Sequence, residues 1–167
     1  MQEEIISARS VPISVVIPAY NSELYIRETL ASINGQTLSV DEIIVVDNNC
    51  TDATAAIARE MGATIIKETK QNIAASRNAG IRASRNDWIA LLDHDDLWAA
   101  DKIKYQWEAA KLYPEARIIG CRFDNRIDSD APNINTLDQQ QTNDNPQELF
   151  RYFPALSFRP NGHRTDK

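Results

Sequence analysis

Short apolar runs alternate along the chain with stretches whose apolar residues recur at helical spacing, and this alternation limits the choice of fold more than any other feature. The apolar runs occupy residues 13–20, 41–47, 63–68, 87–93 and 116–123. The stretches of helical period lie between them, at residues 21–35, 52–61, 72–84 and 100–113. Continuous apolar runs, unlike alternating ones, are typical of strands buried on both faces. The pattern therefore predicts an α/β fold with a mostly parallel sheet flanked by helices.

The predicted helices have recognisable ends. We expect Asn21 or Ser22 to cap the first helix and Gly35 to end it. The apolar stripe of this helix is predicted to contain Leu24, Ile26, Leu30 and Ile33. Asn72 is expected to cap the third helix, and Pro114 to close the fourth. The sequence thus marks where each turn between strand and helix should fall.

The composition of the chain changes after residue 123. Residues 124–145 are rich in Asp, Asn and Gln and have no apolar period, so we expect a flexible polar loop there. Residues 146–167 regain apolar character in ELFRYFPALSFRP and then become polar, so we expect this C-terminal part to be irregular. We therefore divide the chain into a folded core at 1–123, a loop at 124–145 and a terminal segment at 146–167.

Bulk composition excludes several functions. The formal net charge of −6 argues against a nucleic-acid partner, because phosphate backbones attract basic surfaces. No apolar run reaches the roughly 18 residues of a transmembrane helix, and the N-terminus MQEEIISARS lacks the features of a signal peptide. Cys50 and Cys121 are far apart in sequence and are expected to be reduced. We therefore expect a cytoplasmic protein, with an association with the cytoplasmic face of the membrane left open.

Polar side chains follow three of the predicted strands at the point where each strand ends. Tyr20 and Asn21 follow the first, Asp47 and two asparagines follow the second, and residues 93–96 follow the fourth. In parallel sheets ligands bind outside the carboxyl ends of the strands. Solvent-exposed loops are polar in any protein, which explains part of this coincidence. The part of the coincidence that loop polarity does not explain predicts a binding site at this edge of the sheet.

The run WIALLDHDDLW places three carboxylates within four positions, at Asp93, Asp95 and Asp96. Such crowding is tolerated where a cation offsets the repulsion. His94 stands alone among the carboxylates, so a hard ion such as Mg²⁺ or Mn²⁺ suits the cluster better than zinc. Such ions often bind one or two carboxylates together with substrate phosphates. The alternative is a solvated acidic turn at the start of the next helix.

Other cation and phosphate motifs do not fit the sequence. A calcium EF-hand loop beginning at Asp93 would need Gly at its sixth position and Glu at its twelfth, where Trp98 and Lys104 stand. The five glycines, at positions 35, 62, 80, 120 and 162, can form neither a P-loop nor a GxGxxG motif. A nucleotide would therefore have to be held without a glycine-rich loop.

Five sequence blocks between about residues 12 and 123, in the right order, resemble family 2 glycosyltransferases of the GT-A fold. They read SVVIPAYN, LYIRETLASINGQT, EIIVVDNNCTDAT, NIAASRNAGI and DWIALLDHDDLW. The resemblance implies a Rossmann-like GT-A sheet and a role in polysaccharide biosynthesis. It implies transfer of a sugar from a nucleotide diphosphate sugar, with a UDP-sugar favoured, to an acceptor that stays unassigned. A divalent cofactor, Mn²⁺ or Mg²⁺, is also implied, and a homo-oligomer is left open.

The resemblance also implies site residues. Asp47 and Asn48 would contact the base and the ribose, and Arg77 would face the diphosphate. Many family members carry a second aspartate where Asn48 stands, and an asparagine carbonyl can still accept a base N–H. The nucleotide pocket would be lined by Pro18, Ala19, Tyr20 and Asn21, with Tyr20 near the base.

In the DxD-like motif, Asp93 would face the ribose or the sugar, His94 would be a spacer, and Asp95 would bind the metal. Inverting members also need a general base, commonly an acid in an ED-like motif well downstream. FPALSFRPNGHRTDK resembles the segment before that motif, and Asp166 is the only acid after Glu148. We therefore expect the general base to be absent from this chain.

Two functions follow from these expectations. The first is a metal-dependent glycosyltransferase whose catalysis is impaired in this short chain. The alternative is a non-catalytic nucleotide-sugar-binding module, or a degenerate fragment, that acts through a partner. Both use the same predicted donor-binding edge of the sheet.

Overall fold

The computed structural model describes residues 10–121 and 156–158, which form one six-stranded sheet and four helices. In chain order the elements are β1 (Val11–Ala19), α1 (Ile26–Asn34), β2 (Val40–Asp47), α2 (Thr54–Glu60), β3 (Thr64–Lys67), α3 (Ile73–Ala83), β4 (Trp88–Leu91), α4 (Lys102–Leu112), β5 (Ile118–Ile119) and β6 (Leu156–Phe158). The predicted flexible loop at 124–145 lies outside the described residues, as does most of the segment 146–167.

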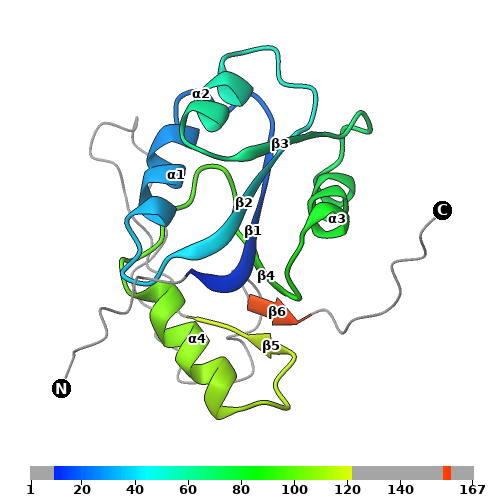
Figure 1. Cartoon of the computed structure of the whole chain (residues 1–167). Helices are drawn as coiled ribbons and strands as arrows, with labels where there is room; N and C mark the ends of the chain where they lie inside the picture. Colours follow the sequence, from blue (N-terminus) through cyan, green and yellow to red (C-terminus); the bar gives the residue numbers. More distant parts are fainter. Residues whose placement is uncertain (1–9, 122–155, 159–167) are drawn as a thin grey trace, which may run out of the picture.

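The strand order of the sheet is β3-β2-β1-β4-β6-β5. β1 pairs in parallel with β2 and β4, and β2 pairs in parallel with β3. β6 is antiparallel to both of its neighbours, β4 and β5. The chain therefore winds outward from β1 to β3 and then returns past β1 to form β4 (Figure 1). This arrangement confirms the predicted fold class, and it places the reversal of strand order between β1 and β4.

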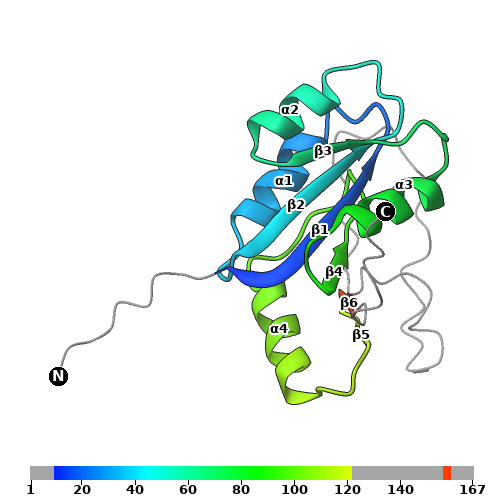
Figure 2. The ribbon, with the colours of Figure 1, turned by 45° about the vertical axis from the view of Figure 1, so that its right-hand side comes forward.

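Helices cover both faces of the sheet. α1, α2 and α4 lie on one face and share a buried cluster with the sheet, to which Leu30 and Ile103 belong. α3 covers the other face, where Ala79 packs in a second cluster with Val16 and Ile44. Figures 1 and 2 show α3 across the sheet from α1 and α2. The central strands are therefore buried on both sides, as their continuous apolar runs indicated.

Gly80 lets α3 lie close to the middle of the sheet. A Cβ atom at this position would collide with the side chain of Val16 on β1 and would lie 3.0 Å from Cγ2 of Val46 on β2. A side chain as small as alanine would therefore push the helix away from both strands. This close packing fixes the position of α3 relative to the carboxyl ends of β1 and β2.

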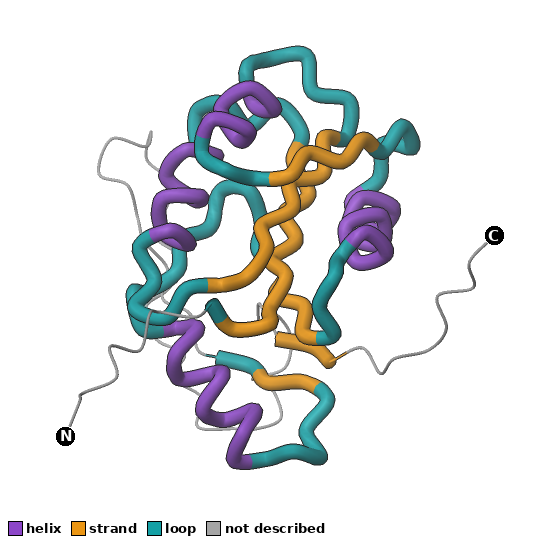
Figure 3. The backbone as a smooth tube through the Cα atoms, in the orientation of Figure 1, coloured by secondary structure: helices purple, strands orange, loops and turns teal. Residues whose placement is uncertain are grey.

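α1 begins later than the sequence predicted. Asn21 has a left-handed backbone (φ 46°), and the Ser22 carbonyl accepts hydrogen bonds from the backbone N–H groups of Tyr25 and Ile26. Residues 21–25 therefore form a loop and a turn before the helix starts (Figure 3). Leu24 is 81% exposed, so its placement in the apolar stripe was wrong. The rest of the stripe is buried as predicted, at Ile26, Leu30 and Ile33.

The start of α3 matches the prediction, whereas the last predicted strand is much shorter than expected. Oδ1 of Asn72 accepts hydrogen bonds from the N–H groups of Ala74 at 2.9 Å and Ala75 at 3.1 Å, which confirms the cap. Of the strand expected at 116–123, the structure describes residues 116–121, and within these only β5, Ile118–Ile119, is a strand. The opening residue of the expected strand, Ala116, instead closes a turn after α4 by donating its N–H to the Tyr113 carbonyl.

Candidate functional site

Three loops meet at the carboxyl edge of the sheet, after β1, β2 and β4. The register aligns Ala19 of β1 with Asp47 of β2, and the N–H of the next residue, Asn48, donates to the Ala19 carbonyl at 3.0 Å. The loop after β4 starts beside them, because the Leu92 N–H donates to the Val16 carbonyl at 3.2 Å. The structure thus brings together the polar segments that follow these strands in the sequence.

Two of the four residues expected to line a nucleotide pocket are exposed. Pro18 and Ala19 are buried within β1, so only their backbone can shape the edge. Tyr20 is 48% exposed. Asn21 is also exposed, and its Oδ1 accepts the Thr51 N–H at 2.9 Å. This bond ties the loop after β1 to the loop after β2 and leaves the Tyr20 side chain partly open to solvent.

Asp47 ends β2 and is buried, with 8% of its surface exposed. Its Oδ1 accepts the Cys50 N–H at 2.8 Å, which turns the chain sharply after the strand.

Burial raises the pKa of the Cys50 thiol, and the Asp47 carboxylate adds to this effect. Neither Cys50 nor Cys121 is part of a disulfide between described residues.

Asn48 holds the neighbouring loop through three hydrogen bonds. Its Nδ2 donates to the carbonyl oxygens of Glu68 at 2.7 Å and Lys70 at 2.9 Å. Its Oδ1 accepts the Asn72 N–H at 3.0 Å. The residue is only 5% exposed. Asn48 therefore joins β2 to the segment before α3, and these bonds do not support the expected contact between its carbonyl and a base.

Arg77 connects α3 to the loop that follows β4. We call residues 93–96 of this loop the acidic loop. Its Nη2 lies 2.6 Å from Oδ1 of Asp93. The two side chains are 35% and 43% exposed, so the pair contributes at most about 1 kcal/mol to stability. Nε of Arg77 is buried and has no hydrogen-bond partner among the described residues. A buried donor without an acceptor is costly, and an anionic ligand would supply the acceptor.

The rest of the acidic loop forms a tight turn around Asp95, whose side chain is 56% exposed. The Asp96 N–H donates to the Asp93 carbonyl at 3.2 Å. Nδ1 of His94 lies 3.9 Å from Oδ1 of Asp95, which is too far for a hydrogen bond. Burial raises the pKa of Asp96, and the charges of Asp95 and Asp93 raise it further. A cation at this turn would reverse that unfavourable interaction.

The acidic loop suits a metal ion for which the protein supplies only some of the ligands. In the stretches that the structure describes, no group of three or more His, Cys, Asp or Glu side chains is arranged to enclose a metal. Mg²⁺ and Mn²⁺ do not require such an enclosure, because phosphate and water oxygens can complete their shells. The exposed Asp95 beside Asp96, with Arg77 close by, fits an ion that arrives together with a phosphate ligand.

Sequence reasoning did not single out three polar residues, in α1 or just after it, that contact the acidic loop or the segment that follows it. They are Thr29, Ser32 and Gln36. Thr29 and Ser32 are three positions apart, which places them on one side of α1, and this spacing was the available signal; Gln36 follows the end of the helix. Thr29 and Gln36 are buried, although polar residues in a predicted helix are usually assigned to its solvent-exposed side.

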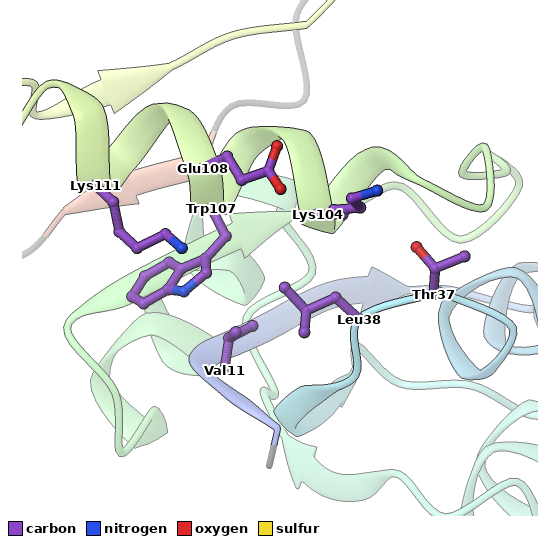
Figure 4. Close-up of a pocket in the computed structure, with 7 residues that line it drawn as sticks. All are labelled: Val11, Thr37, Leu38, Lys104, Trp107, Glu108 and Lys111. Atoms are coloured by element: carbon purple, nitrogen blue, oxygen red, sulfur yellow. The ribbon is translucent and has the colours of Figure 1, made fainter. Parts of the chain in front are cut away.

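A hollow of about 490 Å³ lies far from this edge, between α4 and the amino ends of β1 and β2 (Figure 4). Its lining residues are Val11, Thr37, Leu38, Lys104, Trp107, Glu108 and Lys111. Val11 opens β1, whereas the polar loops follow the last residue of that strand. The hollow is therefore separate from the candidate site.

Solved structures with this fold define the class of the domain. A mannosyltransferase from Pyrobaculum calidifontis, PcManGT, in complex with GDP-Man and Mn²⁺, has a TM-score of 0.59 and 26% identity, over 68% of this chain and 36% of that chain. Residues 1–349 of S. aureus TarS, in complex with UDP, have a TM-score of 0.52 and 28% identity, over 63% of this chain and 32% of that chain. The fold is that of the GT-A class.

The sequence comparison gives the family. Residues 14–164 match Glycosyl transferase family 2, and the chain belongs to this family of enzymes. EpsH of Bacillus subtilis (strain 168), which is named as a glycosyltransferase, is 30% identical over 149 residues, or 86% of this chain and 42% of EpsH. The chain spans less than half the length of the curated relatives it matches. Among the described residues, no helix has the length and apolar character needed to span a bilayer.

Proposed function

We propose that this domain binds a nucleoside diphosphate sugar, preferably a UDP-sugar, together with Mn²⁺ or Mg²⁺, as the donor for sugar transfer. The arrangement of the acidic loop carries the proposal: Arg77 pairs with Asp93, while the Asp95 carboxylate stays exposed beside it. PcManGT was solved with GDP-Man and Mn²⁺, and TarS with UDP, which supports a ligand of this chemical class.

The nucleoside would occupy the edge formed by the loops after β1 and β2. The partly exposed ring of Tyr20 offers an apolar surface for a base. Asp47, which ends β2, offers a carboxylate to hydroxyl or N–H donors of the nucleoside. Asn21 and Asn48 would act by holding these loops in place, because their side-chain oxygens already accept backbone N–H groups.

The diphosphate would lie between α3 and the acidic loop. Nε of Arg77, which has no partner among the described residues, can donate to a phosphate oxygen. Asp95, with its exposed carboxylate, would hold the divalent ion, and Asp93 would keep Arg77 in position until the diphosphate arrives. A bound divalent ion offsets the negative charge that develops on a departing diphosphate. The residues of this chain would therefore bind and orient the donor.

Thermal unfolding with a panel of nucleotides tests this proposal. UDP, GDP and ADP would each be added in excess, once with Mn²⁺ and once with EDTA. A ligand present at about 100 times its Kd stabilises the folded state by about 2.7 kcal/mol, which for this size of domain raises Tm by roughly 5–10 °C. We expect that rise for UDP with Mn²⁺ and a much smaller rise with EDTA. No rise with any nucleotide in the presence of Mn²⁺ would refute the proposal.

A further inference from the structure

One side of α1 is bonded to the backbone of the acidic loop and of the segment that follows it. Oγ1 of Thr29 donates to the His94 carbonyl at 2.8 Å. Oγ of Ser32 accepts the Trp98 N–H at 3.1 Å. These are contacts between segments more than 60 positions apart in sequence, so only the folded chain makes them.

Gln36 extends the same set of contacts beyond the end of the helix. Its Nε2 donates to the Ala99 carbonyl at 2.8 Å, and its Oε1 accepts the Ile103 N–H at 3.0 Å. The next residue, Thr37, donates its N–H to the Ala100 carbonyl at 2.9 Å. We call Thr29 and Ser32 of α1, together with Gln36 just after it, the polar row. The row binds backbone groups, so it fixes the path of the loop whatever side chains the loop carries.

Thr29 binds the acidic loop at the peptide group next to Asp95. The His94 carbonyl belongs to the peptide group that joins His94 to Asp95, so holding this oxygen fixes the peptide plane from which Asp95 extends. Thr29 is completely buried, and water therefore has no access to replace its hydroxyl. Loss of the hydroxyl alone would leave the carbonyl without this donor.

The acidic loop is thus held from both faces of the sheet. Arg77 of α3 binds the Asp93 carboxylate on one side, and Thr29 of α1 binds the His94 carbonyl on the other. These two anchors come immediately before Asp95, whose carboxylate is left exposed. A carboxylate that is fixed through its backbone, with its oxygens free, is prepared to bind an ion with little loss of entropy.

We propose that Thr29 is a positioning residue for Asp95, and that its hydroxyl sets the affinity of the acidic loop for the divalent ion. This inference rests on the proposed function, because it assigns Thr29 a part in the same site. Thr29 itself touches neither the ion nor the nucleotide. Its effect should appear in metal-dependent binding and leave metal-independent binding unchanged.

Three variants test the role of this hydroxyl. Thr29→Val keeps the shape of the side chain and removes the donor, whereas Thr29→Ser keeps the donor. Ser84→Ala removes a buried hydroxyl that donates to the Gly80 carbonyl within α3, and it serves as the control. UDP affinity would be measured by calorimetry for each protein, with EDTA and over a series of Mn²⁺ concentrations.

We expect Thr29→Val to need about tenfold more Mn²⁺ for half-maximal enhancement of UDP binding. Its UDP affinity in EDTA should equal that of the wild type, and Thr29→Ser and Ser84→Ala should need wild-type Mn²⁺ concentrations. An unchanged Mn²⁺ requirement in folded Thr29→Val would overturn the inference. Equal weakening of UDP binding in EDTA and in Mn²⁺ would overturn it too, because that result indicates a general structural role for Thr29.

Two further results keep the outcomes distinct. If wild-type protein shows no Mn²⁺-dependent binding, the proposed function fails, independently of Thr29. If Thr29→Val does not fold, Ser32→Ala takes its place, because it removes the acceptor of the Trp98 N–H in the same loop. That variant should also raise the Mn²⁺ requirement, and a wild-type requirement would count against the polar row as a positioning element.

Discussion

Arg77 holds the first carboxylate of the acidic loop, and this one contact separates the roles of three neighbouring aspartates. Asp93 is paired at 2.6 Å, whereas Asp95 is left exposed. Asp96 closes the turn, and burial raises its pKa. From the sequence, the resemblance assigned Asp93 to the ribose or sugar and Asp95 to the metal, but it gave no structural reason for the difference. The difference between them arises from a helix that approaches from the other face of the sheet.

Replacement of Arg77 tests its part in diphosphate binding. We expect Arg77→Met to weaken UDP binding in the presence of Mn²⁺ by about tenfold or more, because a charge-assisted hydrogen bond to phosphate is lost. The exposed Arg82 lies on the same helix, so Arg82→Met is the matched control and should bind UDP as the wild type does. Calorimetric titration of both variants checks this. Equal affinities in the two variants would exclude Arg77 from the site.

The burial of Lys102 predicts how the free energy of unfolding changes with pH. Its Nζ lies 3.9 Å from the centre of the Trp98 ring and 2.6 Å from Oε1 of Gln106. Burial lowers the pKa of Lys102 to about 8. Above that pH the folded protein releases the proton, whereas the unfolded chain keeps it until about pH 10.4. The unfolded state then binds more protons, so this residue makes the free energy of unfolding increase between these two pH values.

The comparison of wild type with Lys102→Met isolates this effect, because other titrating groups are common to both proteins. The free energy of unfolding of the wild type, relative to the variant, should rise by at most about 3 kcal/mol from pH 8 to pH 10.4. Below pH 8 the difference should be constant. Urea unfolding at a series of pH values measures it. A constant difference throughout would show that Lys102 keeps an ordinary pKa in the folded protein.

At the scale of elements, α1 and α3 act as two supports for the loops at the carboxyl edge. The apolar residues of α1 pack on the sheet, and the polar row holds the segment after β4. α3 starts at the Asn72 cap, which is itself tied to Asn48. The closeness of α3 to the sheet depends on Gly80. Moving either helix should therefore move the site.

Gly80→Ala tests the close packing of α3. The added Cβ meets Val16 and Val46, so we expect a loss of about 1–3 kcal/mol in stability, with weaker UDP binding because Arg77 moves with the helix. Ala83→Ser adds one atom at an exposed position of the same helix and should change stability by less than about 0.5 kcal/mol. Urea unfolding compares the two. Full stability of Gly80→Ala would mean that the helix can shift without cost.

Helix ends show where prediction from sequence reached its limit. The Asn72 cap could be predicted, because it depends on a local bond to the next turn. The start of α1 could not, because Asn21 bonds to Thr51 in a different loop. The hydrogen bonds of Asn48 could not be predicted for a similar reason, because its partners are backbone groups of a loop whose path is set by tertiary packing. Local signals predicted local structure, and distant partners overrode them.

At the scale of the whole molecule, the parallel sheet explains why the meeting of the three polar loops could be predicted. The carboxyl ends of adjacent parallel strands lie together, so polar residues after β1, β2 and β4 had to meet. The antiparallel strand β6 could not be predicted in the same way, because its pairing with β4 joins segments far apart in the chain. The family, the fold and the meeting of the polar loops at this edge were thus available from sequence, whereas the hydrogen bonds among their side chains were not.

Mn²⁺-dependent UDP binding by the Asp95→Asn variant tests the central claim most directly. The substitution removes one charge and keeps the size of the side chain. Asp87→Asn makes the same change before β4, at the other end of that strand, and is the control. We predict that Mn²⁺ strengthens UDP binding by about 100-fold in the wild type and in Asp87→Asn. We predict little or no strengthening in Asp95→Asn, with Tm unchanged within a few degrees. Equal strengthening by Mn²⁺ in Asp95→Asn would contradict the assignment of the metal to this carboxylate.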